Sequence, residues 1–286
     1  MTKPNVAVIA PGGMGAAVGA RLAENGLTVI TLLDGRSAAS AKRASAAGMA
    51  PATDTDIAAA DIVLSIVPPG QAEALADRLQ PALRAANHKP VYVDCNAVNP
   101  DTARHIAATI AAAECPFVDG GIIGGPPRAG YDGPSIYVSG PDAPRVEILK
   151  DYGLKIRTMP GPIGDASALK MSYGGLTKGL IALGSALVLA AERAGVADAL
   201  RAELSASQSP MFSQLTRGVP DMLPKAYRWV AELEEVARYV GPGEEARIFE
   251  GIAALYARLA TDTDGDKTEA KALVDFFARR ESPGRG

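Results

Sequence analysis

Residues 5–15 read NVAVIAPGGMG, and this stretch decides the fold. The run VAVIA is short, β-branched and apolar, which is typical of a strand buried on both faces of a parallel sheet. A Pro-Gly-Gly turn follows, and residues 14–25 then have helical character up to a stop at Gly26. A strand, a glycine-rich turn and a helix in this order predict a site where the helix N-terminus holds a dinucleotide pyrophosphate.

The turn departs from the dinucleotide fingerprint G-x-G-x-x-G at one position. Ala10 stands in the first glycine position, while Gly12 and Gly15 hold the second and third. The second glycine lets the backbone approach a pyrophosphate, and the third lets the helix pack close to the strand. An ordinary strand-to-helix turn is the alternative, but the position after the first strand favours phosphate binding. The predicted contacts to the cofactor phosphates come from Pro11, Gly12, Gly13, Met14 and Gly15.

Strands and helices alternate through the first half of the chain. Apolar runs predict further strands at residues 28–33, 62–67, 91–94, 117–118 and 135–138. The segments between them predict helices at residues 37–47, 71–85 and 101–113. Such alternation requires crossover connections and therefore a parallel sheet. We expect an α/β fold that begins with a Rossmann-type domain, residues 1–163.

The strand pattern disappears after residue 160. Asp165 is a suitable N-cap for a long helix over residues 167–194, which Gly195 ends. We expect this interdomain helix to enter an all-helical domain, residues 164–286. The apolar run LIALGSALVLAA on that helix exceeds what a small helical domain covers, and so predicts a homodimer. Further helices are predicted at residues 198–207, 225–239, 244–259 and 268–280.

The composition excludes several classes of protein. Of 286 residues, 48% are hydrophobic and 21% charged, with a net charge of −3, which excludes wholesale disorder and a basic field for nucleic acid. Two cysteines are too few for a disulfide framework, and no Cys/His cluster has zinc spacing, so we expect no metal. The longest apolar stretch, residues 179–191, is too short to span a bilayer, and the N-terminus lacks a signal-like pattern. We expect a cytoplasmic protein that acts on a small molecule, away from membranes.

Two features at the end of the second predicted strand favour different nicotinamide cofactors. Asp34 is placed to bind a ribose 2′-hydroxyl, which favours NAD(H). Arg36 and Ser37 follow at once, and a guanidinium beside a hydroxyl suits the 2′-phosphate of NADP(H). We expect NADP(H) to be preferred, because Gly35 allows the turn to carry Asp34 away. The ends of the next two strands add three predicted cofactor contacts, Val67, Pro68 and Asn96.

Lys170, early in the long helix, is the candidate for proton transfer. A lysine beside the cleft of a Rossmann-type sheet can be desolvated and act as an acid or base, although a helix lysine taken alone is usually solvated. The only histidines, His88 and His105, are poorly placed for a relay. No tyrosine has a lysine four residues later, which argues against the short-chain dehydrogenases; Tyr173 comes nearest, with a lysine at five.

A glycine-rich segment, residues 119–127, follows the predicted strand at 117–118. Four glycines in seven positions make a poor structural element, so we expect a loop. Its backbone N–H groups can hold a carboxylate, and a tight irregular loop without a ligand is the alternative.

Three motifs give the chain its resemblance to a known family. Residues 10–15 are similar to its G-x-G-x-M-G turn, residues 119–125 to its substrate-loop pattern D-x-P-x-S-G-G, and residues 164–174 to its helix start G-x-x-x-x-x-K-x-x-N-N. The chain resembles the β-hydroxyacid dehydrogenase superfamily over about residues 5–195; the superfamily includes 3-hydroxyisobutyrate and 6-phosphogluconate dehydrogenases and their imine-reductase relatives. The C-terminal part looks like a subgroup of uncharacterised phosphogluconate-dehydrogenase-like proteins. The resemblance implies that Lys170 is the catalytic acid or base and that the helical domains interlock in a dimer.

The substrate-binding residues of that family are largely changed. Ile123 stands where the family has a serine, Gly174 where it has an asparagine, and Asn96 where many members have a serine. Trp229, the only tryptophan, either lines the substrate pocket or packs between helices. The predicted substrate contacts are Asn96, Ile123, Gly124, Gly125, Tyr173, Gly174 and Trp229.

The leading hypothesis is an NAD(P)(H)-dependent oxidoreductase that moves a hydride between nicotinamide and a small hydroxy acid or carbonyl substrate. An imine reductase is the second hypothesis: Ile123 and Gly174 favour it, and Lys170 counts against it. A non-catalytic NAD(P)(H)-binding regulatory protein is the third, and it leaves Lys170 without a role.

Overall fold

The computed structural model describes residues 3–278, and the chain divides into two compact units, up to Met171 and from Ser172 on. The first unit holds an eight-stranded sheet, and the second is helical. The predicted fold class, a Rossmann-type parallel sheet domain followed by an all-helical domain, is confirmed. The division falls inside the long helix α6 (Asp165–Ala194), whereas the sequence places the boundary just before that helix.

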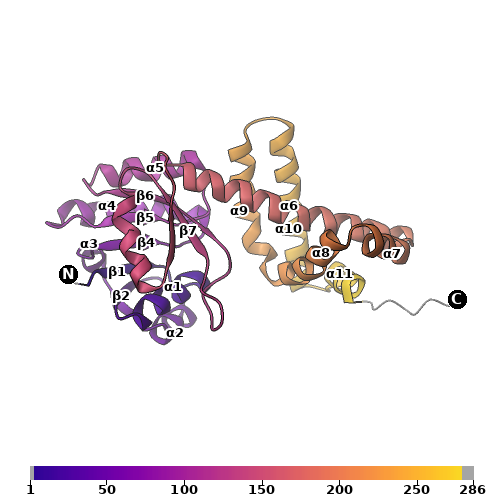
Figure 1. Ribbon diagram of the computed structural model, residues 1–286, viewed down its shortest axis with the longest axis horizontal. Helices are drawn as coiled ribbons and strands as arrows, with labels where there is room; N and C mark the ends of the chain where they lie inside the picture. The colour runs from indigo at the N-terminus through magenta and orange to yellow at the C-terminus, as the bar shows by residue number, and fades with distance from the viewer. Residues whose placement is uncertain (1–2, 279–286) are drawn as a thin grey trace. The chain divides into compact units, whose positions relative to one another are not determined.

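The sheet has the strand order β3-β2-β1-β4-β5-β6-β7-β8. Figure 1 labels the inner strands of this sheet, β2, β1, β4, β5, β6 and β7. All neighbouring strands are parallel except β6 and β7. The order reverses between β1 and β4, and a crevice opens outside the carboxyl ends of strands at such a point. The strands are β1 (Asn5–Ile9), β2 (Thr28–Leu32), β3 (Ala50–Ala52), β4 (Ile62–Ser65), β5 (Val91–Asp94), β6 (Phe117–Ile123), β7 (Ser135–Ser139) and β8 (Lys155–Thr158).

Helices cover both faces of the sheet, as Figure 1 shows for α1 and α2 on one side and α4 and α5 on the other. Side chains alternate between the two faces, because Val6 and Val8 join one hydrophobic cluster and Ala7 and Ile9 join the other. Both faces of the parallel strands are therefore buried, as their apolar runs predict. The helical elements of this unit are α1 (Gly13–Glu24), α2 (Ala38–Ala46), α3 (Asp54–Ala58), η1 (Pro69–Gln71), α4 (Ala72–Ala85), α5 (Pro100–Ala111) and η2 (Ala143–Tyr152).

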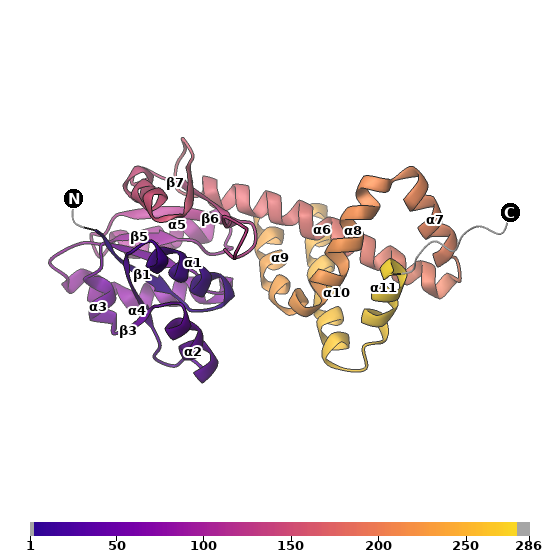
Figure 2. The same ribbon diagram turned by 60° about the horizontal axis from the view of Figure 1, so that its bottom comes forward.

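The second unit is built on α6, with α9 packed along α10 (Figure 2). Glycines on α6 allow close packing: a Cβ at Gly184 would lie 2.5 Å from a methyl carbon of Leu215 on α8. Helix α6 is long and apolar enough to cross a membrane, by length and composition alone. Core helices of soluble proteins share these two properties, and 44% of the most apolar 18-residue part of α6 is buried. Residues 179–191, the apolar stretch singled out in the sequence, form part of this 30-residue helix. The other helices are α7 (Ala197–Ser207), α8 (Ser209–Met222), η3 (Leu223–Lys225), α9 (Ala226–Val240), α10 (Glu244–Asp264) and α11 (Thr268–Ala278).

Several elements differ from the sequence-based expectation, among them β3, β8 and α8. The short strands β3 and β8 lie at the two edges of the sheet, where β3 contains a proline and β8 exposes most of its side chains, so neither has an apolar signature. The sequence pattern predicts no helix over residues 209–222, where the structure has α8 with Pro210 and Pro220 inside it. Pro210 lies in the first turn, where the missing N–H has no helical partner to lose. The last two residues of the predicted helix 268–280 lie outside the described residues.

Candidate active site

The glycine turn has the geometry that a bound pyrophosphate requires. Gly12 is the N-cap of α1, and a Cβ on Gly12 or Gly13 would meet no atom within 4 Å. No acidic residue lies in the first turn of α1 and no side chain caps it. A Cβ on Gly15 would lie 2.0 Å from the carbonyl oxygen of Ala10, so only glycine allows this approach of helix to strand. The turn therefore fits a dinucleotide phosphate, held by backbone N–H groups and the positive end of α1.

The loop after β4 lies beside this turn at the point where the strand order reverses. The Ala10 N–H donates to the carbonyl oxygen of Ile66 over 3.3 Å, and the Ile66 N–H donates to that of Ile9. The Val67 N–H donates to Asn96 Oδ1 over 2.6 Å. These bonds bring together the predicted cofactor contacts from the ends of β1, β4 and β5.

Asn96 is buried and its side chain is engaged within the protein. Its Oδ1 accepts from Val67, and its Nδ2 donates to Ser65 Oγ over 2.8 Å and to a carboxyl oxygen of Asp94. Only 2% of Asn96 is exposed. The structure therefore gives Asn96 a role in fixing the Val67 loop, and its predicted contact with a ligand stays a prediction.

Asp94 makes stability depend on pH. Burial first, and then the neighbouring charge of Asp119, raise the pKa of this carboxyl from 3.8 to about 8. The folded protein holds a proton between these values that the unfolded chain releases, so the free energy of unfolding should fall as pH rises from about 4 to about 8. Asp94→Asn, a neutral replacement for the protonated acid, should flatten this decrease in urea unfolding measured across that window. Equal slopes for the two proteins would contradict the assignment.

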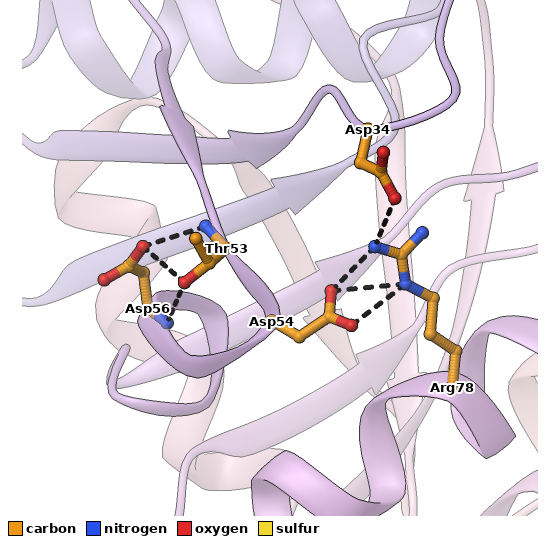
Figure 3. Close-up of polar contacts among 5 residues, drawn as sticks. All are labelled: Asp34, Thr53, Asp54, Asp56 and Arg78. Atoms are coloured by element: carbon orange, nitrogen blue, oxygen red, sulfur yellow. Dashed lines mark hydrogen bonds and ion pairs between the residues drawn. The ribbon is translucent and has the colours of Figure 1, made fainter.

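Asp34 is held by an arginine that lies far away in the sequence (Figure 3). The Arg78 guanidinium, on α4, lies 3.2 Å from Asp34 Oδ2 and 3.0 Å from Asp54 Oδ1. The hydrogen bond to Asp54 is the main reason that the pKa of Arg78 is raised. A capping box between Thr53 and Asp56 fixes the start of α3 and with it Asp54 (Figure 3). The negative charge of Asp34 is thus paired, a feature that local sequence could not reveal.

Arg36 and Ser37 lie at the same end of the sheet. Ser37 Oγ caps α2 by accepting from the Ser40 N–H over 3.3 Å. Among residues 3–278, no hydrogen bond or ion pair involves the Arg36 guanidinium, which is half-buried. Sequence reasoning missed Arg43, whose Nε donates to the Pro11 carbonyl over 3.0 Å and whose Nη2 donates to Ser40 Oγ over 2.9 Å. The spacing of Ser37, Ser40 and Arg43 along one helix face was the available signal.

Lys170 lies at the carboxyl end of β6. Its Nζ donates to the carbonyl oxygen of Ile122 over 2.6 Å, and the side chain is half-buried. The expected loop is wrong in part, because Gly120 and Gly121 belong to β6. A Cβ on Gly121 would lie 2.7 Å from the Ala166 carbonyl oxygen, so this glycine allows α6 to contact the strand. Backbone packing explains these two glycines, and no ligand is needed to account for them.

The other predicted substrate residues fall into two groups. In the first unit, Ile123 ends β6, and the exposed residues Gly124 and Gly125 follow it. Gly124 has φ of +125°, a conformation that favours glycine. In the second unit, Gly174 is buried and 49% of Tyr173 is exposed. Their contact with substrate stays a prediction.

Trp229 belongs to a polar and aromatic cluster within the helical unit. The Lys178 ammonium lies 5.5 Å from the centre of its ring and 2.6 Å from Glu232 Oε2. The ring of Tyr256 packs edge-on to Trp229, and its hydroxyl donates to the Lys178 carbonyl over 2.5 Å. Trp229 therefore takes part in helix packing, one of the two alternatives, and its predicted pocket role stays open. Among the described residues, no group of three or more His, Cys, Asp or Glu side chains is arranged to hold a metal ion.

Comparisons with known proteins agree with this geometry. An uncharacterized 28.5 kDa protein from Methanothermus fervidus is 29% identical over 63% of this chain and 68% of its own length. A solved conserved protein of unknown function, described as similar to 3-hydroxyacid dehydrogenases, is 28% identical with a TM-score of 0.66, over 89% of this chain and 99% of its own.

Two enzymes of known activity share the fold at 18% identity. The Mycobacterium tuberculosis 3-hydroxyisobutyrate dehydrogenase has a TM-score of 0.69 over 97% of this chain and 98% of its own. The Myxococcus stipitatus imine reductase, solved with NADP+, has a TM-score of 0.55 over 96% of this chain and 100% of its own.

Family models cover most of the chain. The model for the NAD binding domain of 6-phosphogluconate dehydrogenase matches residues 5–156, and that for a domain of unknown function (DUF1932) matches residues 191–259. The predicted resemblance is confirmed, and the chain belongs to the family defined by the NAD binding domain of 6-phosphogluconate dehydrogenase.

Proposed function

We propose that this protein is an NAD(P)(H)-dependent oxidoreductase that acts on a small hydroxy acid or the corresponding carbonyl compound. The observation that carries the proposal is the placement of Lys170 at the carboxyl end of β6, in the same unit as the glycine turn at the end of β1. When bound, the nicotinamide supplies hydride transfer to or from a carbon atom. The residues that would hold the dinucleotide are the backbone of Gly12–Gly15, the loop at Val67 and Pro68, and the side chains of Arg36 and Ser37.

Lys170 is the proton donor and acceptor in this proposal. Reduction of a carbonyl leaves negative charge on its oxygen, and Lys170 Nζ donates a proton to that oxygen. In oxidation, the neutral amine takes the proton of the hydroxyl group. The bond to the Ile122 carbonyl holds the ammonium at the carboxyl end of β6.

Imine reduction is the second candidate, because Ile123 places an apolar side chain where a serine would bind a carboxylate. A cofactor-oxidation screen with matched carbonyl and imine panels separates the two. We expect turnover with carbonyl compounds, and turnover confined to imines would overturn the first proposal. Binding of NADPH without turnover on either panel would favour a regulatory protein.

We infer a preference for NADP(H) from the charges at the end of β2. Arg78 pairs with Asp34, which reduces the repulsion that a 2′-phosphate would meet there. The Arg36 guanidinium has the charge and the planar donors that suit a phosphate.

We also expect a cytoplasmic location, because Cys95 and Cys115 are free and buried, as suits a reducing compartment.

We propose a homodimer through α6. Leu176, Leu183 and Leu187 repeat at intervals of seven and four residues on one helix face, and their exposed fractions are 77%, 56% and 65%. A second copy of the chain presents the same stripe and is the partner that symmetry provides most readily.

We therefore expect sedimentation to show a dimer at micromolar concentration. Leu183→Glu together with Leu187→Glu should yield a monomer, because two charges would be buried without partners. Tyr227→Glu is the matched control, since Tyr227 lies on α9 and is equally exposed at 65%. A monomeric wild-type protein would reject the proposal.

A further inference from the structure

The buried carboxylate of Asp119 connects β6 to the first turn of α6. Asp119 is 0% exposed. Its Oδ2 accepts from the N–H groups of Gly164 over 2.9 Å and Ser167 over 3.1 Å, and its Oδ1 accepts from Ser167 Oγ over 2.6 Å. The helix begins at Asp165, so the expected N-cap role of that residue is wrong, and Asp119 satisfies the first N–H groups from across the sheet.

Ser139 on β7 supports the same turn. Its hydroxyl donates to Asp119 Oδ2 over 3.0 Å and accepts from the Ala166 N–H over 3.0 Å. Three N–H groups at the start of α6 are thus bound to side chains of two adjacent strands. These bonds fix the position of the helix along its axis and its rotation about that axis.

Lys170 follows Ser167 by three residues, nearly one helical turn. Its Nζ donates to Ile122 O, three residues beyond Asp119 on the same strand. Between these two attachments, Gly121 allows direct contact, because a Cβ there would lie 3.2 Å from Lys170 Cβ. Strand β6 therefore holds the helix on both sides of its closest approach.

We propose that Asp119 is a positioning residue for Lys170. Lys170 lies nearly one helical turn after Ser167. A small rotation of the helix about its axis would therefore move the Lys170 ammonium away from the end of β6. Proton transfer requires the acid within hydrogen-bond reach of the reacting oxygen, and a misplacement of about 1 Å can cost on the order of 100-fold in rate. This inference rests on the proposed function, because it acts through the proton chemistry of Lys170.

The test is a double-mutant cycle on kcat with Asp119→Asn and Lys170→Ala. Asparagine keeps one acceptor oxygen for the Gly164 and Ser167 N–H groups but removes the negative charge, so these bonds lose their charge-assisted strength and hold the helix start less firmly. We expect Asp119→Asn to lower kcat by about 10- to 100-fold with Lys170 present. The Kd of NADPH should be unchanged, because the glycine turn is not altered. In the Lys170→Ala background the same substitution should change kcat by less than about twofold, since coupled residues are non-additive.

Ser167→Ala is the milder variant, in case Asp119→Asn does not fold. It removes the 2.6 Å bond and keeps the carboxylate. Ser172→Ala is the matched control, because its hydroxyl on α6 bonds to Tyr239 instead. Ser167→Ala should lower kcat only when Lys170 is present, and Ser172→Ala should not lower it.

Two results would overturn the inference. One is wild-type kcat in folded Asp119→Asn or, if that variant does not fold, in folded Ser167→Ala. The other is an equal loss of kcat in both backgrounds, which is what a purely structural role would produce. Wild-type kcat in Lys170→Ala alone is a different outcome, since it rejects the proton role of Lys170 in the proposed function.

Discussion

Lys170→Ala is expected to lower kcat by about 10²- to 10⁴-fold, the usual contribution of a general acid or base. The Kd of NADPH should stay within about twofold of wild type, because the turn at Gly12–Gly15 belongs to a different part of the sheet edge. Lys170→Arg should be nearly as slow. Arginine can keep the bond to the Ile122 carbonyl, but it does not release its proton.

Lys225→Ala is the matched control for this prediction. Lys225 is a lysine of the helical unit whose ammonium pairs with Asp221 over 2.7 Å. Its removal should leave kcat unchanged. If Lys170→Ala turned over substrate at the wild-type rate, the proton donor would lie elsewhere, and Tyr173 would be the next candidate.

Arg36→Ala is expected to weaken NADPH binding by about 10- to 100-fold and to leave NADH binding nearly unchanged. Hydrogen bonds to a charged group contribute about 1.5–3 kcal/mol, and 1.4 kcal/mol is a factor of ten in affinity. Titration calorimetry with both cofactors gives the ratio directly. Lys42→Ala on α2 is the control, because it removes one exposed positive charge from the helix that follows Ser37.

Arg78→Leu tests the same preference for NADPH over NADH by removing the partner of Asp34. Without Arg78, Asp34 loses its partner and repels a 2′-phosphate, so the ratio should move toward NADH. An unchanged ratio in Arg36→Ala would remove Arg36 from the role. A wild-type preference for NADH would assign the ribose contact to Asp34.

The parts of the site that depend on neighbouring residues in the sequence were predictable. The turn at residues 10–15 is recognisable because a strand, a helix and the spacing of Gly12 and Gly15 are all local features. The contact between Gly15 and the Ala10 carbonyl, five residues apart, shows why. The alternation of strands and helices likewise predicted the parallel sheet.

The parts that depend on strand register and on distant packing were not predictable. The bond from Val67 to Asn96 needs β4 and β5 aligned side by side, and no local pattern specifies that register. The pairing of Arg78 with Asp34 spans 44 residues. The sequence predicts a loop at Gly120 and Gly121 because glycine usually weakens a strand. In the structure a neighbouring backbone approaches Gly120 closely, and α6 approaches Gly121.

The most direct test of the central claim follows deuterium from NADPH labelled at the transferred position of the nicotinamide. The protein is incubated with this cofactor and a panel of small keto acids and aldehydes, and the products are analysed by mass spectrometry. The account predicts deuterium on the carbinol carbon of a hydroxy product, at a rate that Lys170→Ala lowers by about 10²-fold or more. Deuterium found only in amine products of a parallel imine panel, or tight NADPH binding with no transfer to either panel, would contradict it.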